Sequence, residues 1–421
     1  MVFSATTPLQ PTPSKAVSRL MLPERQAIAT PNVRSADRQL LSHARDGYMD
    51  TTHFDTVRFP PPEWASDIFE YAARDGSLAY TGYRGNENVL QRVAANVARF
   101  LGVPVDPARN LILTPGTQGA LFAVLAAQID PGDRVATMDP DYLFAARILA
   151  FLGADIGYVP MIEAGEEFTI DLEALEQEFS HHRTKHFVFS HPNNPTGAVF
   201  SKPVIQGIAA LAQRYGVSVT VDELYSRLVY GERTFHHLAA EDGMFARTAT
   251  LLGPSKTESL SGYRLGIVVG SDDLLQSVEN VLSISALRAP AYAQHLLPFW
   301  LGPDEDWLRA RIEEFEKLRG LTLSKLNELP WLDVKPQGGT AYLWPDVSPL
   351  RLSDLDLAIA FLENANVLVS PGYQFGPTAS GRFRLCYARD ERSWSEALDK
   401  MLDIMDAAGR RFGLDGRRKG C

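Results

Sequence analysis

The chain has 421 residues, of which 45% are hydrophobic and 22% are charged, and its formal net charge is −10. These values are typical of a soluble globular protein with two or three domains, and they exclude a disordered, collagen-like or coiled-coil chain. The acidic balance argues against nucleic-acid partners, and no apolar run approaches the ~20 residues of a membrane span. The two cysteines, Cys386 and Cys421, form neither a metal motif nor a disulfide framework. We therefore expect a cytoplasmic chain without a signal peptide.

The first 305 residues divide into an arm and a predicted α/β domain. Residues 1–47 are polar, with prolines early and charges later, which predicts an extended or poorly ordered arm. In residues 76–305, short apolar runs alternate with helical patterns, which is typical of a mostly parallel sheet between helices. The predicted strands are Leu111–Thr114, Arg134–Met138, His186–Ser190, Ser218–Val221, Ala249–Leu252 and Leu265–Gly270. The predicted helices are Gln118–Gln128, Tyr142–Phe151, Leu172–Phe179 and Ile205–Tyr215.

The last third of the chain has a different pattern, which predicts a smaller α+β domain over residues 306–421, joined by residues 48–75. A long amphipathic helix is predicted over Trp307–Leu326, and a closing helix over Ser393–Arg411. The predicted strands between them are Trp331–Lys335, Ala341–Trp344, Val367–Ser370 and Arg382–Tyr387.

Two polar runs follow predicted strands directly. The run HPNNPTG begins at His191, at the carboxyl end of a strand, where open α/β sheets bind ligands. Asp222 ends the next strand and Tyr225 follows three residues later. A carboxylate at a buried strand end needs a partner, and a protonated pyridine nitrogen would suit Asp222. The Tyr225 hydroxyl could then bond a phenolate oxygen nearby. Each run is also typical of a simpler feature, an ordinary turn or a helix cap.

A third run, GPSKTESLSGYRLG, places Lys256 just after another apolar strand. A lysine in an enclosed site forms an imine with a carbonyl group, whereas in an open loop it is only a solvated cation. Ser255 and Arg264 are suited to hold a phosphate, the arginine by two parallel hydrogen bonds.

The fourth run, TPGTQGALFAVL, contains a glycine turn between a strand and a helix. Gly116, Thr117 and Gln118 place free backbone N–H groups at the start of that helix, which suits an anion. An ordinary strand–helix connection has the same pattern, and no Walker motif follows.

Taken together and in this order, the four runs resemble the fold type I enzymes that use pyridoxal 5′-phosphate, close to the class I and II aminotransferases of the aspartate aminotransferase group. The resemblance covers about residues 48–405. It implies a large cofactor-binding domain with a mostly parallel central sheet, a smaller α+β domain, and a homodimer. It also implies transfer of the α-amino group between an L-amino acid, aspartate or a related one, and a 2-oxo acid.

The resemblance assigns site residues one by one. It implies a catalytic set of Lys256 as Schiff-base lysine, Asp222 at the pyridine nitrogen and Tyr225 at the 3′-oxygen. Arg384 falls where the family binds the substrate α-carboxylate, and Asn194 and Phe54 are expected near the substrate. The implied cofactor-binding residues are Gly116, Thr117, Gln118, Tyr142, Asn194, Asp222, Tyr225, Ser255, Lys256 and Arg264, with Tyr80 reaching a neighbouring subunit's phosphate.

Two positions depart from the family pattern. Gly253 stands where the family usually has a serine or threonine that binds the phosphate. Phe54, Asp55 and Thr56 replace a G-x-P run next to the substrate. The first departure removes a hydroxyl donor, and the second leaves the shape of the side-chain pocket open.

Several alternatives remain open from the sequence. Arg288 is either a partner for a distal substrate carboxylate or a surface helix residue, and Tyr83, Phe54 and Tyr373 would instead line an apolar pocket. The activity itself has two alternatives, a β-lyase of the cysteine-S-conjugate type and a catalytically idle binding module. The paired histidines, interpreted as surface or loop residues without metal-ligand spacing, are His181, His182, His236 and His237. Cys386 is expected to fill the core.

Overall fold

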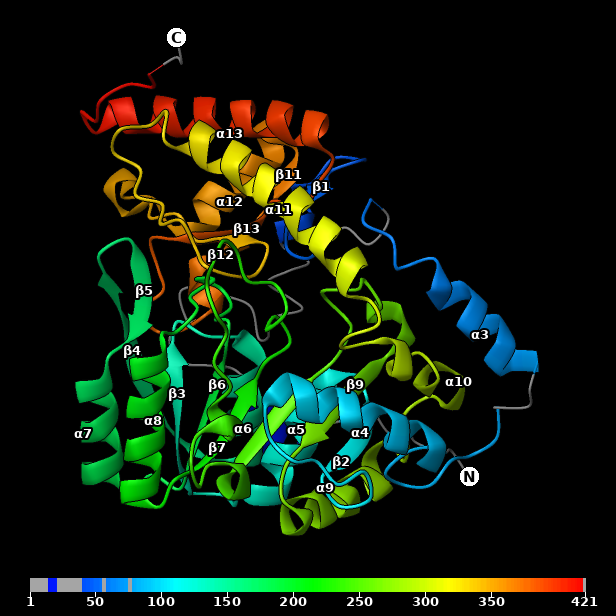
Figure 1. Cartoon of the computed structure of the whole chain (residues 1–421). Helices are drawn as coiled ribbons and strands as arrows, with labels where there is room; N and C mark the ends of the chain where they lie inside the picture. Colours follow the sequence, from blue (N-terminus) through cyan, green and yellow to red (C-terminus); the bar gives the residue numbers. More distant parts are fainter. Residues whose placement is uncertain (1–13, 21–39, 55–57, 75–77, 419–421) are drawn as a thin grey trace, which may run out of the picture.

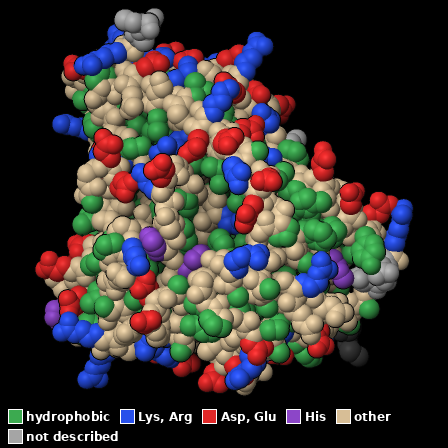
Figure 2. Space-filling model, viewed as in Figure 1, with side chains coloured by type: hydrophobic (Ala, Val, Ile, Leu, Met, Phe, Trp, Pro, Cys, Tyr) green, Lys and Arg blue, Asp and Glu red, His purple; other side chains and the backbone are tan. Residues whose placement is uncertain are grey.

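The computed structural model describes residues 14–20, 40–54, 58–74 and 78–418. Most of the predicted arm therefore lies outside the described residues. Figure 1 shows a lower part built on one large sheet and an upper part with long helices. On the face shown in Figure 2, acidic and basic side chains are intermixed. None of the described helices is both long and apolar enough to cross a membrane.

The large sheet has the strand order β2-β9-β8-β7-β6-β3-β4-β5. Its strands are β2 (Leu111–Pro115), β3 (Arg134–Asp139), β4 (Asp155–Ala164), β5 (Glu167–Ile170), β6 (His186–Ser190), β7 (Ser218–Asp222), β8 (Thr248–Leu252) and β9 (Leu265–Val269). The pairs from β8 through β4 are parallel, whereas β9 is antiparallel to both of its neighbours and β5 is antiparallel to β4. The prediction of a mostly parallel sheet is therefore confirmed.

Helices cover both faces of this sheet because successive side chains of a strand point in opposite directions. On β6, Phe187 and Phe189 pack with Ile205, and Val188 between them packs with Val124 on the opposite face. The helices of this part are α4 (Glu87–Leu101), α5 (Thr117–Gln128), α6 (Leu143–Leu152), α7 (Leu172–His182), α8 (Lys202–Tyr215), α9 (Asp272–Ser285) and the short α10 (Ala291–Gln294). All four helices predicted for this region are confirmed.

The smaller part holds short strands under long helices. β10 (Tyr342–Leu343), β13 (Phe383–Cys386) and β12 (Ser370–Pro371) form one antiparallel sheet in that order, and β1 (Met49–Asp50) pairs in parallel with β11 (Val367–Leu368). Its helices are α11 (Glu305–Leu326), α12 (Asp354–Ala365) and α13 (Glu391–Arg411). Two further α-helices among the described residues are α1 (Lys15–Ser18) and α3 (Trp64–Arg74). Cys386 is fully buried here, as expected.

One predicted strand is wrong, the two-residue β1 was missed, and so were two strands of the large sheet. Trp331–Lys335 forms no strand, because it lies between two prolines and pairs only at Asp333, through an isolated bridge to Asp346. The two missed strands of the large sheet, β4 and β5, extend it at its edge. The burial of β4 is uneven, and its sequence DIGYVPMIEA contains Gly157 and Pro160, so no continuous apolar run marks it.

Candidate active site

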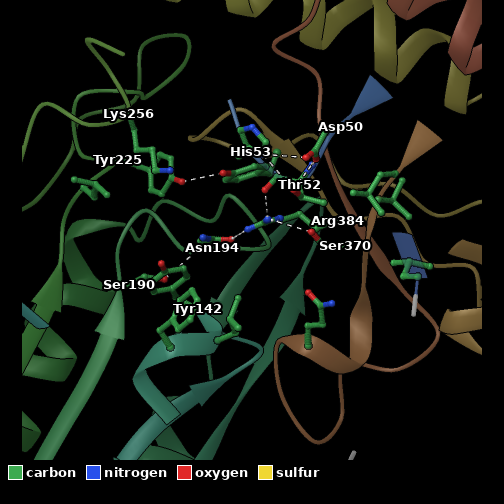
Figure 3. A pocket seen from close by; sticks show the side chains of 18 of the residues that line it. Asp50, Thr52, His53, Tyr142, Ser190, Asn194, Tyr225, Lys256, Ser370 and Arg384 are labelled. Atoms are coloured by element: carbon green, nitrogen blue, oxygen red, sulfur yellow. Dashed lines mark hydrogen bonds and ion pairs between the residues drawn. The ribbon is translucent and has the colours of Figure 1, made fainter. Parts of the chain in front are cut away.

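A cavity of about 390 Å³ opens where the carboxyl ends of β6 and β7 face the smaller part (Figure 3). Ser190 and Asp222 end these neighbouring strands and are paired in register. The loops that follow β6, β7 and β8 therefore bring Asn194, Tyr225 and Lys256 to one edge of the sheet, and all three line the cavity. The lining residues from the smaller part include Tyr342, Leu368, Val369, Ser370 and Arg384.

Arg384 is a buried cation on β13, with 5% of its surface exposed. Its guanidinium donates hydrogen bonds to the Asn194 side-chain oxygen (2.7 Å), the Thr52 backbone oxygen (2.6 Å) and the Ser370 hydroxyl (3.2 Å). Nε of Arg384 has no hydrogen-bond partner among the described residues, and none of their carboxylates forms an ion pair with this side chain. A buried guanidinium in this state favours binding of an anion.

Asp222 is an acidic group that lines the same cavity as the Arg384 cation. Burial raises the pKa of its carboxyl to about 6, although the Leu224 N–H (3.2 Å) and the nearby Lys256 both favour the charged form. A protonated aromatic nitrogen would compensate a carboxylate in this position.

Lys256 and a pair of tyrosines lie between these groups. The Lys256 amine is 6.0 Å from the centre of the Phe54 ring, and no described residue forms a hydrogen bond or ion pair with it. The Tyr225 and Tyr342 hydroxyls are 3.0 Å apart. Phe54 does not line the cavity. It is buried against both tyrosine rings and helps to fix their positions.

The turn before α5 forms a cradle for an anion. Gly116 has φ +80°, and a Cβ atom there would lie 2.4 Å from Nη2 of Arg264, so only glycine leaves room for that guanidinium. The N–H groups of Thr117 and Gln118 are the first of the helix. Gln118 also accepts a hydrogen bond from the Tyr142 hydroxyl (3.2 Å), which ties this turn to the cavity wall.

The departure at Gly253 has a steric counterpart. A Cβ atom at Gly253 would lie 3.1 Å from the Leu265 backbone oxygen and 3.3 Å from the Thr117 methyl group. A serine or threonine at this position would therefore require a small shift of the Leu265 backbone or of the Thr117 side chain. Ser255, two residues further on, is buried in the loop that leads to Lys256.

The residues of the anion cradle do not line the cavity themselves, and Tyr80 and Arg288 lie apart from it as well. Tyr80 is 82% exposed and is not a lining residue. The Arg288 guanidinium lies 4.9 Å from the Tyr80 ring and 4.3 Å from the Tyr83 ring, and it donates a hydrogen bond to the Thr81 backbone oxygen (2.7 Å). Arg288 follows α9 and is not part of a helix. Asp55 and Thr56 lie outside the described residues.

Some residues of the site could not be found from the sequence. Tyr342 belongs to an apolar run, and nothing local distinguishes it from Trp344, which faces a different core. His53 and Asp50 also line the cavity, 3.4 Å apart. His237 is a loop residue, as expected, but its ring is only partly exposed and bonds the buried Glu223 carboxylate at 2.6 Å.

Metal ligation has no support in the geometry. No cluster of three or more histidine, cysteine, aspartate or glutamate side chains with the geometry of a metal site occurs within residues 14–20, 40–54, 58–74 and 78–418. The cavity instead holds an amine and a carboxylate that favours a cationic partner, and the anion cradle is linked to its wall through the hydrogen bond between Tyr142 and Gln118.

Comparison with known proteins gives a consistent family. Residues 51–401 match the family described as aminotransferase class I and II. An aromatic-amino-acid aminotransferase of Thermococcus litoralis is 28% identical over 349 residues, covering 82% of this chain and 89% of that protein. An arginine–pyruvate transaminase of Pseudomonas aeruginosa is 30% identical over 312 residues, covering 74% and 78%.

A solved structure extends this similarity to three dimensions. An aspartate aminotransferase from Rhodobacter sphaeroides is 35% identical and has a TM-score of 0.82, covering 86% of this chain and 93% of that chain. All three of these relatives are named as aminotransferases or transaminases, so the β-lyase alternative receives no support. The chain belongs to the class I and II aminotransferase family and is a pyridoxal-phosphate-dependent transaminase.

Proposed function

We propose that Lys256, Asp222 and Tyr225 are the catalytic residues and that Arg384 binds the substrate α-carboxylate. The observation that carries this assignment is the cavity itself, in which a cation without a carboxylate partner, an amine and a carboxyl of raised pKa lie together. The cradle of Gly116 and Arg264 fits the phosphate end of pyridoxal phosphate, and Asp222 fits its ring nitrogen.

Each residue then has a defined task. Bound pyridoxal phosphate supplies an electron-withdrawing ring that stabilises negative charge at the substrate Cα. The Lys256 amine would anchor the cofactor and, when free, would take the proton from the substrate Cα as general base and deliver it to the cofactor as general acid. Arg384 fixes the substrate by its carboxylate, and Asn194 holds the guanidinium from behind through their 2.7 Å hydrogen bond. Tyr225, buried with its hydroxyl against Tyr342, is a hydrogen-bond donor to the cofactor 3′-oxygen.

The substrate side chain is the least constrained part of the proposal. Aspartate is supported by the names of several relatives, among them the Rhodobacter enzyme. A second candidate, an aromatic or aliphatic amino acid, is supported by the apolar residues that line the cavity, which include Leu40, Leu41, Tyr48 and Phe144. Initial rates with the common amino acids, and with 2-oxoglutarate and pyruvate as acceptors, decide between these candidates.

A homodimer completes the proposal. The residue assigned to the neighbouring subunit, Tyr80, lies with Leu78 and Ile284 among the most exposed large apolar side chains of the described residues, at 82%, 65% and 88%. Such exposure favours a protein partner. The role in amino-acid metabolism and the cytoplasmic location remain predictions from the family resemblance and the cysteine content.

The assignment of Lys256 has a direct test. Lys256→Ala is expected to lose transamination and borohydride trapping of a pyridoxyl adduct, because both the anchor and the proton carrier are removed. Lys317→Ala, a change at a lysine whose side chain is 69% exposed on α11, is the control and keeps both. Near-normal turnover by Lys256→Ala would reject the assignment. Steady release of pyruvate without an amino acceptor would instead favour the β-lyase, and an unchanged cofactor spectrum on adding amino acids would favour an idle module.

A further inference from the structure

Tyr342 lies between the two halves of the site. It enters the cavity from β10 of the smaller part, 2% exposed, and it is not among the residues that the family resemblance assigned. Its hydroxyl is 3.0 Å from that of Tyr225, and its ring lies under the Arg384 guanidinium, with Cζ of Arg384 4.1 Å from the ring centre. One side chain therefore contacts both the group assigned to the cofactor oxygen and the group assigned to the substrate carboxylate.

The ring of Tyr342 supports a buried cation. Arg384 has only neutral hydrogen-bond partners among the described residues, so no carboxylate offsets its charge. The faces of Tyr342 and Phe375, the latter at 4.8 Å, supply the remaining favourable electrostatics. A carboxylate partner would do the same but would compete with the substrate, whereas an aromatic face leaves the outer side of the guanidinium available.

The hydroxyl of Tyr342 fixes the direction of a hydrogen bond. Each tyrosine hydroxyl has a single proton to donate. If Tyr225 donates its proton to an acceptor in the cavity, the bond between the two tyrosines requires Tyr342 to be the donor. The Phe54 ring packs edge-on against Tyr342 and stacks on Tyr225, which holds the two rings in place. Arg384 and Tyr142 act electrostatically on the Tyr225 hydroxyl, and Asp222 acts in turn on Tyr142.

We propose that Tyr342 is a positioning residue with two separable tasks, its ring holding Arg384 for the substrate carboxylate and its hydroxyl directing the Tyr225 hydroxyl toward the cofactor. This proposal rests on the proposed roles of Tyr225 and Arg384. Because the two tasks belong to different parts of one side chain, two substitutions separate them.

The first substitution, Tyr342→Phe, keeps the ring and removes the hydroxyl. We expect the affinity for 2-methylaspartate, which has no Cα hydrogen to lose, to stay within about twofold, since the ring under Arg384 is intact. We also expect the pH midpoint of the bound cofactor's absorbance change to rise by about half a unit, the size of one weakened hydrogen bond. Without the Tyr342 hydroxyl, Tyr225 is a weaker hydrogen-bond donor and leaves more negative charge on the cofactor oxygen. The proton whose loss changes the cofactor's absorbance is then held more tightly, so its pH midpoint rises. In steady-state kinetics kcat falls, and KM changes little.

The second substitution, Tyr342→Leu, removes the ring as well. The pH midpoint of the cofactor's absorbance change is expected to shift as in Tyr342→Phe. The dissociation constant of 2-methylaspartate is expected to rise by about five- to thirtyfold, because a desolvated cation–π contact is lost. Tyr387→Phe is the matched control, because this buried tyrosine of the smaller part bonds Tyr230 and the Thr340 backbone and is not a lining residue. It leaves both quantities unchanged.

The outcomes are distinguishable from a failure of the proposed function. If the parent enzyme shows no cofactor band that titrates and responds to amino acids, the proposed function fails. If the parent behaves as expected but Tyr342→Phe leaves the midpoint unchanged, or weakens 2-methylaspartate as much as Tyr342→Leu does, the proposal for Tyr342 is rejected. Thermal unfolding of Tyr342→Phe, which keeps the packing volume of the ring, confirms that a folded variant is being compared.

Discussion

At the scale of single residues, the site depends on charges that are buried without an opposite charge beside them. Arg384 and Asp222 are the two main cases, a cation that lacks a carboxylate and a carboxyl whose pKa burial raises to about 6. Each is unfavourable in the isolated fold and becomes favourable when a ligand of opposite charge binds. Local sequence patterns identified Asp222 because it ends an apolar strand. They did not identify the contact of Arg384 with Asn194, which joins positions 190 residues apart.

Removal of Arg384 is expected to weaken the reaction strongly. Arg384→Ala leaves the substrate carboxylate unpaired, and we expect kcat/KM to fall by the equivalent of about 2–5 kcal/mol, mainly through KM. Steady-state kinetics with the best amino donor provide the measurement. Arg392→Ala, a change on the exposed surface of α13, is the control. An unchanged kcat/KM in Arg384→Ala would show that the carboxylate binds elsewhere.

Asp222 should limit the stability of the cofactor-free chain. Its folded-state pKa of about 6 exceeds the usual 3.8, so ionisation disfavours the folded state progressively as the pH rises from about 4 to about 6. Asp222→Asn removes this charge. We expect the cofactor-free variant to be about 1–3 kcal/mol more stable than the parent above pH 6 and equal to it below pH 4. Urea unfolding at pH 4 and pH 7.5 measures the difference.

Asp390→Asn provides a contrast for Asp222→Asn. Hydrogen bonds from Ser393 lower the pKa of the exposed Asp390 carboxyl, so this change should not stabilise the chain at any pH. A gain in stability for both variants would show that the effect at Asp222 is not one of burial.

At the scale of elements, a buried ionic cluster joins three segments around the site. Arg227, two residues after Tyr225, contacts Glu258, two residues after Lys256, and Asp304, which caps α11. Both carboxylates are fully buried and the guanidinium nearly so. The cluster therefore links the loops after β7 and β8 to the first turn of the longest helix. It was not predicted, because its members are scattered along the chain and resemble ordinary helix-cap and loop residues.

This cluster gives a prediction for stability. Arg227→Ala leaves two buried carboxylates without a cation, and we expect the free energy of unfolding to fall by about 3–5 kcal/mol at pH 8. Burial raises the pKa of Glu258 to about 7, so the loss should be smaller near pH 5, where this carboxyl is protonated. Urea unfolding at both pH values is the measurement, with the exposed Arg309→Ala on α11 as control. Equal losses for the two variants would contradict the prediction.

The elements themselves were predictable to different degrees. Strands buried on both faces, such as His186–Ser190, appear in the sequence as continuous apolar runs and were found at their observed bounds. β4 carries no such run, because its burial is uneven and Gly157 and Pro160 interrupt it, and β1 is only two residues long. Trp331–Lys335 has the composition of a strand but only a single bridge, which shows that composition alone does not supply a pairing partner.

At the scale of the whole molecule, exposed apolar side chains predict how two copies associate. Ile284 near the end of α9 and Leu287 just after it are both exposed, and the next residue, Arg288, contacts the Tyr80 ring. We expect Ile284→Asp to shift the protein toward monomers in sedimentation velocity and to weaken cofactor binding, since the monomer loses the partner's Tyr80. Phe412→Asp, on the far end of the chain, is the control. A fully active monomer would overturn the proposed dimer.

The pairing of β1 with β11 has a consequence for how the protein is made. Thr51 lies between the strands that carry Leu368 and Cys386, and it bonds the backbone of both. Thr51 and Leu368 are 317 residues apart, so at roughly 5–20 residues per second the ribosome needs roughly 15–60 s to deliver the second after the first. Throughout that interval β1 lacks β11, the strand with which it pairs. A nascent chain can complete its large sheet while still tethered, but the pocket for an amino acid closes only after the segment that carries Arg384 has also been made.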